Sequence, residues 1–366
     1  MKRIALLVYD VSLTGGAERV AINLANEFAG QDRVYILSVF STGVSSKGID
    51  ERVSCIALSN HYEKIPVKFL KYKNKLRKIL VDEKIDILMS ITAGVVTLAI
   101  QAAKGLRTEV IYCEHSNLEN RTYGRKHVFR QYFGAKKADA VVTLTERDRQ
   151  NFIRMFKVAP ERVFTIPNWY EKKNCSTEYN SDSKKIISVG RLEKVKGYEY
   201  TIDCADVILR RNPEWQWDIY GDGSQRTELQ ESISHKGIER LTLKGNVADI
   251  DKRYAEYAFL VMTSRYEGLP LSLLEAQTSL LPIVSFDCPT GPSEIIEDGV
   301  NGFVVPLFDV DALIQKIQRL IDSQEERISF SEHSQDKLCF YEKARVMRLW
   351  NELFQKLLVD GDDADD

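Results

Sequence analysis

The feature that most constrains this chain is an alternation of short, β-rich apolar runs with segments of helical spacing. In the first half the runs cover residues 4–10, 34–40, 53–58, 85–91, 110–114 and 140–145. Apolar residues at helical spacing separate several of these runs, as at 17–28 and 68–80. Because helices make the crossovers between parallel strands, the alternation predicts βαβ units around a parallel sheet.

The same alternation starts again at Lys184. The runs of the second half cover residues 186–189, 217–220, 241–244, 259–263, 283–286 and 303–305. A chain of 366 residues is too long for one ordinary core and long enough for two domains. We therefore expect an α/β protein with two Rossmann-like domains.

The expected domain boundaries follow the composition. The two domains are predicted at 1–170 and 184–340, and the polar, aperiodic stretch 171–183 is interpreted as a linker. A final helix is expected over 341–358. The acidic residues 359–366 are expected to form a solvated, disordered tail.

Composition excludes several classes of protein. Apolar residues make up 44% and charged residues 28%, the balance of a soluble globular protein. The six cysteines form no C-x-x-C pair and have no histidine at zinc spacing, which favours buried thiols in a reducing compartment. No secretory signal follows Met1, and the apolar stretch 87–103 is interrupted and shorter than the ~20 residues of a spanning helix. We expect a cytoplasmic protein.

Basic residues concentrate in the first half of the chain. Residues 1–180 hold 29 Lys and Arg against 19 Asp and Glu, a net charge of +10, and the remainder carries −12. The segment from Lys64 to Lys78 alone contains seven Lys and Arg. A second cluster, from Arg121 to Lys137, mixes basic residues with tyrosines and phenylalanines.

Two interpretations of these basic clusters remain open. They are either solvated helices that cover the core, or a peripheral contact with anionic lipid on the inner face of the cytoplasmic membrane. No nucleic-acid-binding motif accompanies the charge, so nucleic acid is not an expected partner.

Several short segments carry a family resemblance. They are GRLEKVKG at 190–197, YGDGS at 220–224, SRYEGLPLSLLEA at 264–276, GPSEII at 291–296 and GVNG at 299–302. Together with Gly15 and Gly16 after the first predicted strand, they resemble the family-4 retaining glycosyltransferases, also called glycosyl transferases group 1, of the GT-B fold. The resemblance implies two Rossmann-like domains that face each other across a cleft, with the C-terminal helix returning toward the N-domain. It also implies that the N-terminal domain, 1–170, binds the acceptor and that the C-terminal domain, 184–340, binds the nucleotide sugar.

The resemblance also implies an activity. It implies transfer of a hexose or N-acetylhexosamine from a UDP-sugar to a saccharide acceptor, expected to be lipid-linked, in surface polysaccharide or glycan assembly. Three alternatives stay open: a GDP-mannose-dependent mannosyltransferase of the same fold, a non-transferase GT-B enzyme such as a nucleotide-sugar epimerase, and a non-catalytic sugar-nucleotide-binding subunit. No D-x-D pair ends a predicted strand, and Asp249 is interpreted as a helix cap, so neither a metal nor another cofactor is expected.

Two glutamates are the first candidates for the donor site. Glu267 lies in a predicted strand-to-helix loop, and Glu275 lies about a turn and a half inside the helix. Open α/β sheets bind ligands at the carboxyl ends of their strands, and a helix start offers N–H groups to a diphosphate. The resemblance gives Glu267 the donor-sugar hydroxyls and Glu275 the ribose hydroxyls. The residues expected beside the phosphates are Gly268, Leu269, Pro270 and Leu271.

Two cations are the matching candidates for the leaving group. Arg191 follows a predicted strand directly, and Lys196 precedes Gly197 at the start of the next helix. The helix dipole disfavours cations there, so a bound anion would explain them. Cations aimed at a departing diphosphate stabilise the charge that develops in the transition state. Ordinary surface charge is the alternative interpretation.

The remaining candidates come from loops at predicted strand ends. His115 follows the strand at 110–114, and the resemblance gives it a contact with the donor sugar near the reacting carbon. A histidine in a core hydrogen bond is the alternative. The other donor-binding positions implied by the resemblance are Gly15, Gly16, Gly190, Gly221, Gly223, Asn246, Val247 and Gly291.

Overall fold

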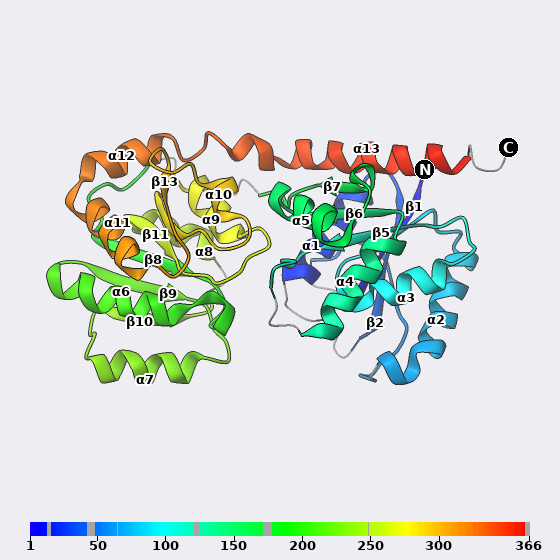
Figure 1. Cartoon of the computed structure of the whole chain (residues 1–366), viewed down its shortest axis with the longest axis horizontal. Helices are drawn as coiled ribbons and strands as arrows, with labels where there is room; N and C mark the ends of the chain where they lie inside the picture. The colour runs from blue at the N-terminus through cyan, green and yellow to red at the C-terminus, as the bar shows by residue number, and fades with distance from the viewer. Residues whose placement is uncertain are drawn as a thin grey trace. The chain divides into compact units, whose positions relative to one another are not determined.

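Two parallel β-sheets organise the protein, as Figure 1 shows for a computed structural model. The structure describes residues 1–12, 16–41, 48–63, 65–120, 124–170, 178–247 and 249–362. The chain divides into two units. Unit 1 comprises Met1–Pro167 with Met347–Asp366, and unit 2 comprises Asn168–Val346.

Unit 1 is built on a seven-stranded sheet in the order β3-β2-β1-β4-β5-β6-β7. Its strands are β1 (Arg3–Asp10), β2 (Arg33–Phe40), β3 (Ser54–Ala57), β4 (Ile87–Ser90), β5 (Glu109–Glu114), β6 (Ala140–Thr143) and β7 (Val163–Thr165). Its helices are α1 (Gly16–Phe28), α2 (Ile65–Asp82), α3 (Ala93–Ala103), α4 (Arg125–Lys137) and α5 (Glu146–Phe156). The central strands are buried almost throughout, which explains why they appear as continuous apolar runs rather than alternating ones.

The last helix, α13 (Lys343–Asp362), completes unit 1. Trp350 and Phe354 pack their rings against Phe28 of α1, at centroid distances of 6.0 and 5.2 Å. Lys356 donates from Nζ to the Glu161 carbonyl at 3.0 Å.

Two expectations about unit 1 are corrected. The final helix was expected over 341–358 with a disordered tail from 359, but α13 continues through Asp362. Residues 363–366 lie outside the described part. The three-residue strand β7, only partly buried, adds to the six runs read from the sequence.

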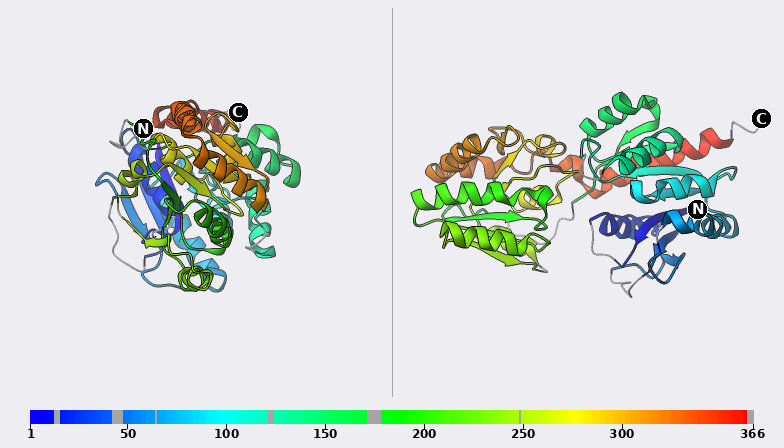
Figure 2. Two further views of the ribbon diagram at one scale, coloured as in Figure 1. Left: turned by 90° about the vertical axis from the view of Figure 1, so that its left-hand side faces the viewer. Right: turned by 60° about the horizontal axis from the view of Figure 1, so that its bottom comes forward.

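Unit 2 is built on a six-stranded sheet in the order β10-β9-β8-β11-β12-β13. Its strands are β8 (Lys185–Val189), β9 (Gln216–Tyr220), β10 (Leu241–Gly245), β11 (Phe259–Met262), β12 (Ile283–Phe286) and β13 (Gly302–Val305). Its helices are α6 (Tyr198–Arg211), α7 (Arg226–Lys236), α8 (Ile250–Arg253), α9 (Leu271–Thr278), α10 (Pro292–Ile295), α11 (Val310–Asp322) and α12 (Gln324–Glu332). Figure 2 shows the strands between layers of helices.

The prediction of an α/β protein with two parallel sheets is confirmed. Every recorded strand pair is parallel, and each unit has its own apolar core. In each sheet the carboxyl ends of the parallel strands lie at one edge. The candidate residues lie in the loops that leave this edge or in the helices that follow these loops. None of the helices in the described ranges has the length and apolar content needed to cross a bilayer.

Candidate functional site

Two glycine-containing loops meet at the carboxyl ends of β8 and β9. The Gly190 amide donates to the Tyr220 carbonyl at 3.0 Å, and the Leu192 amide donates to the Asp222 carbonyl at 3.0 Å. A Cβ on Gly221 would lie 1.9 Å from the Gly190 oxygen. Gly221 is therefore required by this close approach, whether or not it also touches a ligand.

Gly223 is constrained in the same way. A Cβ there would lie 2.5 Å from the Leu192 oxygen, so the two loops form one layer of closely packed backbone. Arg191 extends from this layer with an exposed side chain. Hydrogen bonds from Ser224, and then the charge of Arg191, lower the pKa of Glu193.

Lys196 and Glu267 form the central ion pair of unit 2. The distance from Lys196 Nζ to Glu267 Oε1 is 2.6 Å, and the side chains are 20% and 10% exposed. The Ser264 hydroxyl donates to the same carboxylate oxygen at 2.5 Å. A buried pair of this kind is costly to break, because removing one partner leaves the other charge desolvated.

The backbone of Glu267 is held by the loop that follows the neighbouring strand β12. Its amide donates to the Pro289 carbonyl at 3.0 Å, and its carbonyl accepts from the Thr290 amide at 3.0 Å. The Thr290 hydroxyl donates to the Gly268 carbonyl at 2.9 Å, and Gly291 follows directly. The loop after β12 therefore supports the loop after β11.

Helix α9 begins at Leu271, immediately after this loop. Leu269 is buried, and Pro270 occupies the N-cap position of α9. The first turn of a helix leaves backbone N–H groups without intrahelical partners, and its dipole favours an anion.

Glu275 of α9 lies beside a buried pair of tyrosines. The Tyr254 hydroxyl donates to Glu275 Oε2 at 3.2 Å, and the Tyr198 hydroxyl donates to the Gly190 carbonyl at 3.0 Å. Burial raises the pKa of Tyr198, and the charge of Glu267 raises it further. Burial, then Glu275, and also Tyr198 raise the pKa of Tyr254.

These interactions place the two glutamates in one cluster of unit 2. The charge of Glu267 raises the pKa of Tyr198, and Tyr198 raises the pKa of Tyr254. The Tyr254 hydroxyl in turn donates to Glu275. The two tyrosines were not singled out from the sequence. The available signal was the position of Tyr198, directly after the segment that ends in Lys196-Gly197.

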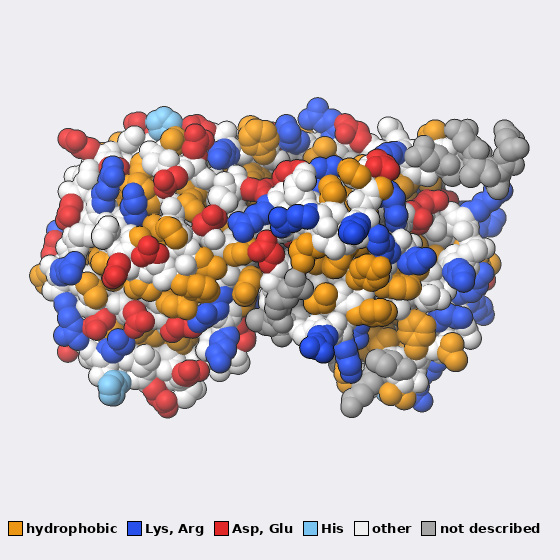
Figure 3. All heavy atoms as spheres, viewed as in Figure 1, with side chains coloured by type: hydrophobic (Ala, Val, Ile, Leu, Met, Phe, Trp, Pro, Cys, Tyr) orange, Lys and Arg blue, Asp and Glu red, His pale blue; other side chains and the backbone are white. Residues whose placement is uncertain are grey.

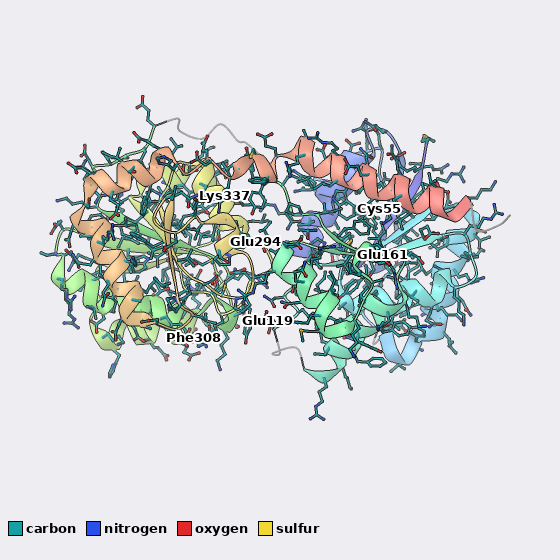
Figure 4. The ribbon with its side chains drawn as sticks, turned by 45° about the horizontal axis from the view of Figure 1, so that its top comes forward. Cys55, Glu119, Glu161, Glu294, Phe308 and Lys337 are labelled. Atoms are coloured by element: carbon teal, nitrogen blue, oxygen red, sulfur yellow. The ribbon has the colours of Figure 1, made fainter. Side chains whose placement is uncertain are left out.

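Arg265 fixes the loop that carries Glu267. Its amide donates to the Val195 carbonyl at 2.8 Å, and its guanidinium hydrogen-bonds Glu199. The guanidinium carbon lies 4.8 Å from the Tyr200 ring centroid and 5.5 Å from that of Phe308, which Figure 4 labels. The loops of Lys196 and Glu267 are thus joined by backbone, charge and ring contacts.

Asn246 and Val247 follow β10 and are exposed. Val247 lines a pocket of about 310 Å³ together with Tyr220 and Lys244. At its wall, Tyr257 donates from its hydroxyl to Asp218 at 2.7 Å.

His115 belongs to unit 1, where it directly follows β5. Both ring nitrogens are buried and find no hydrogen-bond partner in the described ranges. Burial lowers the pKa of His115 to about 4, against a smaller raising effect of Glu114. The ring is therefore neutral at physiological pH, and the described ranges offer it no core hydrogen bond.

The glycine loop of unit 1 is described only in part. Gly16 is the first residue of α1, and Gly15 lies outside the described residues. Across the described residues, His, Cys, Asp and Glu side chains form no group of three or more that could hold a metal ion. Asp249 occupies the N-cap position of α8, as expected, but its side chain makes no capping hydrogen bond there.

Comparisons with known proteins identify the family of this chain. The family model described as glycosyl transferases group 1 matches residues 171–337, and that described as glycosyltransferase family 4 matches residues 14–172. An uncharacterized glycosyltransferase of Haemophilus influenzae is 26% identical, with 96% of this chain and 99% of that protein covered.

A second curated relative comes from Campylobacter jejuni. It is named GalNAc-alpha-(1->4)-GalNAc-alpha-(1->3)-diNAcBac-PP-undecaprenol alpha-1,4-N-acetyl-D-galactosaminyltransferase, and it is 26% identical over 98% of this chain and 99% of its own length. Among solved structures, a mutant of S. aureus TarM in complex with Fondaparinux, alpha-GlcNAc-glycerol and UDP superposes with a TM-score of 0.81 at 18% identity, covering 97% of this chain and 100% of that one.

The two family models together span nearly the whole chain, and the protein belongs to the family-4, group 1 glycosyltransferases of the GT-B fold. It is accordingly an enzyme of the glycosyltransferase class.

Proposed function

We propose that the protein transfers a hexose or N-acetylhexosamine from a UDP-sugar to a saccharide acceptor, with retention of configuration, in polysaccharide or glycan assembly. The observation that carries this proposal is the Lys196–Glu267 pair beside the start of α9, with Glu275 on the same helix. The relative from Campylobacter jejuni is named for N-acetylgalactosamine transfer to a PP-undecaprenol saccharide, and the TarM structure contains UDP. The first name supports a lipid-linked acceptor, and the second supports a UDP-sugar donor.

The proposed donor contacts follow from charge. Lys196, Arg191 and the first amides of α9 bind the diphosphate, where developing negative charge needs donors. Glu267 accepts hydrogen bonds from the donor-sugar hydroxyls, and Glu275 accepts them from the ribose. The pocket beside Val247 receives the base, flanked by Asn246.

The reaction we propose proceeds on one face of the sugar. The bond from the anomeric carbon to the diphosphate oxygen breaks, and the acceptor oxygen bonds to the same carbon from the same side. The acceptor proton passes to the departing phosphate oxygen, so no carboxylate nucleophile is required. His115, neutral at its lowered pKa, orients the donor sugar and does not act as a base.

Activity measurements with two variants test the roles of the ion pair. Lys196→Ala should lower kcat by roughly 10²- to 10³-fold, the usual effect of removing one donor from developing negative charge. Glu267→Gln keeps the hydrogen-bonding shape and should lower kcat while UDP binding changes little. Normal turnover in both variants would contradict the proposed roles.

A thermal-shift panel tests the donor. UDP-, GDP-, ADP- and dTDP-sugars are compared at equal concentration, and a ligand at 100 times its Kd stabilises the native protein by about 2.7 kcal/mol. We expect UDP-sugars to raise the unfolding temperature most. A larger rise with GDP-mannose would show that GDP-mannose, and not a UDP-sugar, is the donor. Product formed without an acceptor would favour an epimerase, and donor binding without turnover would favour a binding subunit. Activity should survive EDTA, since the proposal uses no metal.

We also propose a peripheral contact of unit 1 with anionic membrane through the segments 64–78 and 121–137. Figure 3 shows hydrophobic side chains over α4 and its neighbours, with Lys and Arg side chains along α2. Val67 and Leu70 of α2, and Phe129 and Tyr132 of α4, are all exposed. Each basic residue near an anionic surface adds about 1 kcal/mol of binding.

Vesicle flotation tests this contact. Vesicles with anionic lipid should capture the protein at low salt, and Phe129→Ala with Tyr132→Ser should weaken the capture. Neutral vesicles are the control. Failure of anionic vesicles to retain the wild-type protein would rule the contact out.

A further inference from the structure

Tyr62 of unit 1 is an exposed aromatic residue with a fixed ring. It lies in the loop after β3, and 59% of it is exposed. Exposed apolar residues are common on soluble proteins, so exposure alone identifies no site. What distinguishes Tyr62 is the packing of its ring against other rings, which leaves the rest of the side chain accessible.

The rings behind Tyr62 form a rigid support. Phe40, fully buried at the end of β2, lies 5.2 Å from the Tyr62 centroid. Tyr9 of β1 lies 5.2 Å from Phe40 and 6.5 Å from Tyr62. Tyr72 of α2, also fully buried, meets Phe40 edge-on at 5.7 Å. We call Tyr9, Phe40, Tyr62 and Tyr72 the aromatic platform.

The Tyr62 side chain is also linked to Tyr9. Burial, then the Tyr62 hydroxyl, raises the pKa of Tyr9 to about 12. Contacts with the rings of Phe40 and Tyr9 limit the motion of the Tyr62 ring. A surface that is ordered before binding loses less conformational entropy when a ligand arrives.

The aromatic platform lies at the ligand-binding edge of the unit 1 sheet. Asp10, the last residue of β1, pairs in register with Phe40, the last residue of β2, so the platform begins where both strands end. Open α/β sheets bind their ligands at this edge. In unit 1 the same edge carries Gly16, at the start of α1, and His115, after β5.

Polar groups surround the rings. Asp10 accepts from the Ser12 amide at 2.9 Å. The charge of Arg130 lowers the pKa of the Tyr9 hydroxyl, against the larger raising effect of burial. Glu63, next to Tyr62, accepts from Lys71 Nζ at 2.9 Å. An exposed aromatic ring with polar groups nearby suits a pyranose ring, which has an apolar C–H face and hydroxyls at its edge. The electron-rich face of an aromatic ring attracts such C–H groups.

We propose that Tyr62 stacks against a pyranose ring of the acceptor saccharide and that the aromatic platform is an acceptor-binding subsite. This inference rests on the proposed glycosyltransfer, because it assigns the acceptor of that reaction to a surface of unit 1.

Saturation-transfer NMR with simple sugars tests the subsite. The probes are the methyl glycosides of glucose, galactose, mannose, N-acetylglucosamine and N-acetylgalactosamine. At least one should receive saturation on its ring C–H protons from the wild-type protein. Tyr62→Ala should weaken its binding by roughly three- to tenfold, the loss expected for one ring-stacking contact. Tyr62→Phe and Tyr62→Trp, which keep the ring, should bind within about twofold of wild type.

Matched controls separate stacking from general damage. Phe340→Ala removes an aromatic residue that is 49% exposed on the turn Leu338–Tyr341 of unit 2, and it should leave glycoside binding unchanged. UDP is added to every sample as a second ligand. A UDP-induced thermal shift equal to wild type shows that the Tyr62 variants are folded and keep their donor site.

Several results would overturn the inference. One is unchanged glycoside binding by Tyr62→Ala, and another is a wild-type protein that transfers saturation to none of the glycosides. A third is a Tyr62→Ala variant that binds UDP or lipid vesicles more weakly but binds the glycosides as wild type does. A UDP shift that is missing from wild type itself would contradict the proposed function instead, so the two failures are distinguishable.

Discussion

Asp148 of unit 1 is a buried carboxylate whose nearby charges are acidic. It lies in the first turn of α5 and accepts from the Leu118 amide at 3.3 Å, so it holds the loop that follows His115. Burial, and then the charge of Glu114, raises the pKa of Asp148 to about 7, and Glu119 adds to the rise. The folded protein therefore keeps a proton that the unfolded chain releases near its ordinary pKa of 3.8.

This difference predicts a pH-dependent stability. The free energy of unfolding should fall as pH rises from about 4 to 7, because the folded state binds the extra proton in that window. Asp148→Asn imitates the protonated form and should be more stable than wild type at pH 8 by about 2 to 4 kcal/mol, since one pKa unit is worth 1.36 kcal/mol. At pH 4 the two proteins should be nearly equal.

Urea unfolding at pH 4 and pH 8 measures this difference. Asp249→Asn, an exposed aspartate in unit 2, is the control and should behave like wild type at both values. If Asp148→Asn changed the free energy of unfolding equally at pH 4 and pH 8, the pH dependence would not come from Asp148.

Single residues also show which parts of the candidate site could be predicted from the sequence. Lys196 and Glu267 were predicted to share a site because both belong to loops between strands and helices of the second half and to motifs of the family resemblance, and they form an ion pair. Tyr198 and Tyr254 were missed, since their contacts join segments far apart in sequence, and only the position of Tyr198 after Lys196-Gly197 gave a local signal. The neutral state of His115 also depends on burial, which a motif does not encode.

At the scale of elements, the layer formed by the loops after β8 and β9 should be sensitive to any added atom. Gly221→Ala would put a Cβ 1.9 Å from the Gly190 oxygen, and Gly221 also has a φ of +134°. Backbone would have to move, so we expect destabilisation of about 2 to 4 kcal/mol. Thermal unfolding and UDP binding measure the effect on the fold and on the site.

Gly237→Ala is the matched control for this substitution. Gly237 has a φ of +65°, but a Cβ there would meet no atom within 4 Å. It should cost only the conformational strain, about 1 kcal/mol. Equal losses in the two variants would show that the close approach at Gly221 does not matter.

Elements were predicted best where buried runs were long. The central strands were recognised because both faces are covered and their residues are continuously apolar. The short strand β7 lacked that signal, and the end of α13 was placed too early because its acidic residues resembled a tail. The function of the exposed faces of α2 and α4 was left open, since amphipathic helices cover cores and membranes alike.

At the scale of the whole molecule, the groups proposed to bind the diphosphate all belong to unit 2. Arg191, Lys196 and the start of α9 lie within Asn168–Val346, as do Glu267 and Glu275, the proposed partners of the sugar and ribose hydroxyls. UDP without a sugar should therefore slow hydrogen exchange in the loops after β8, β11 and β12, because a ligand reduces opening of the elements it binds. The central strands of unit 1 should exchange at an unchanged rate.

Mass spectrometry of exchanged peptides checks this prediction. Lys196→Ala is the control, because it should reduce the UDP-dependent protection in proportion to its loss of affinity. If UDP slowed exchange only in unit 1, the nucleotide site would lie in unit 1 and the proposed site in unit 2 would be wrong.

The membership of α13 in unit 1 has a consequence for synthesis. Phe28 of α1 is covered by Trp350 and Phe354, which are made more than three hundred residues later. While a ribosome is still translating unit 2, the nascent first half exposes an apolar surface that only the end of the chain can cover. Chaperone binding to stalled chains should fall once residues 347–354 have left the exit tunnel.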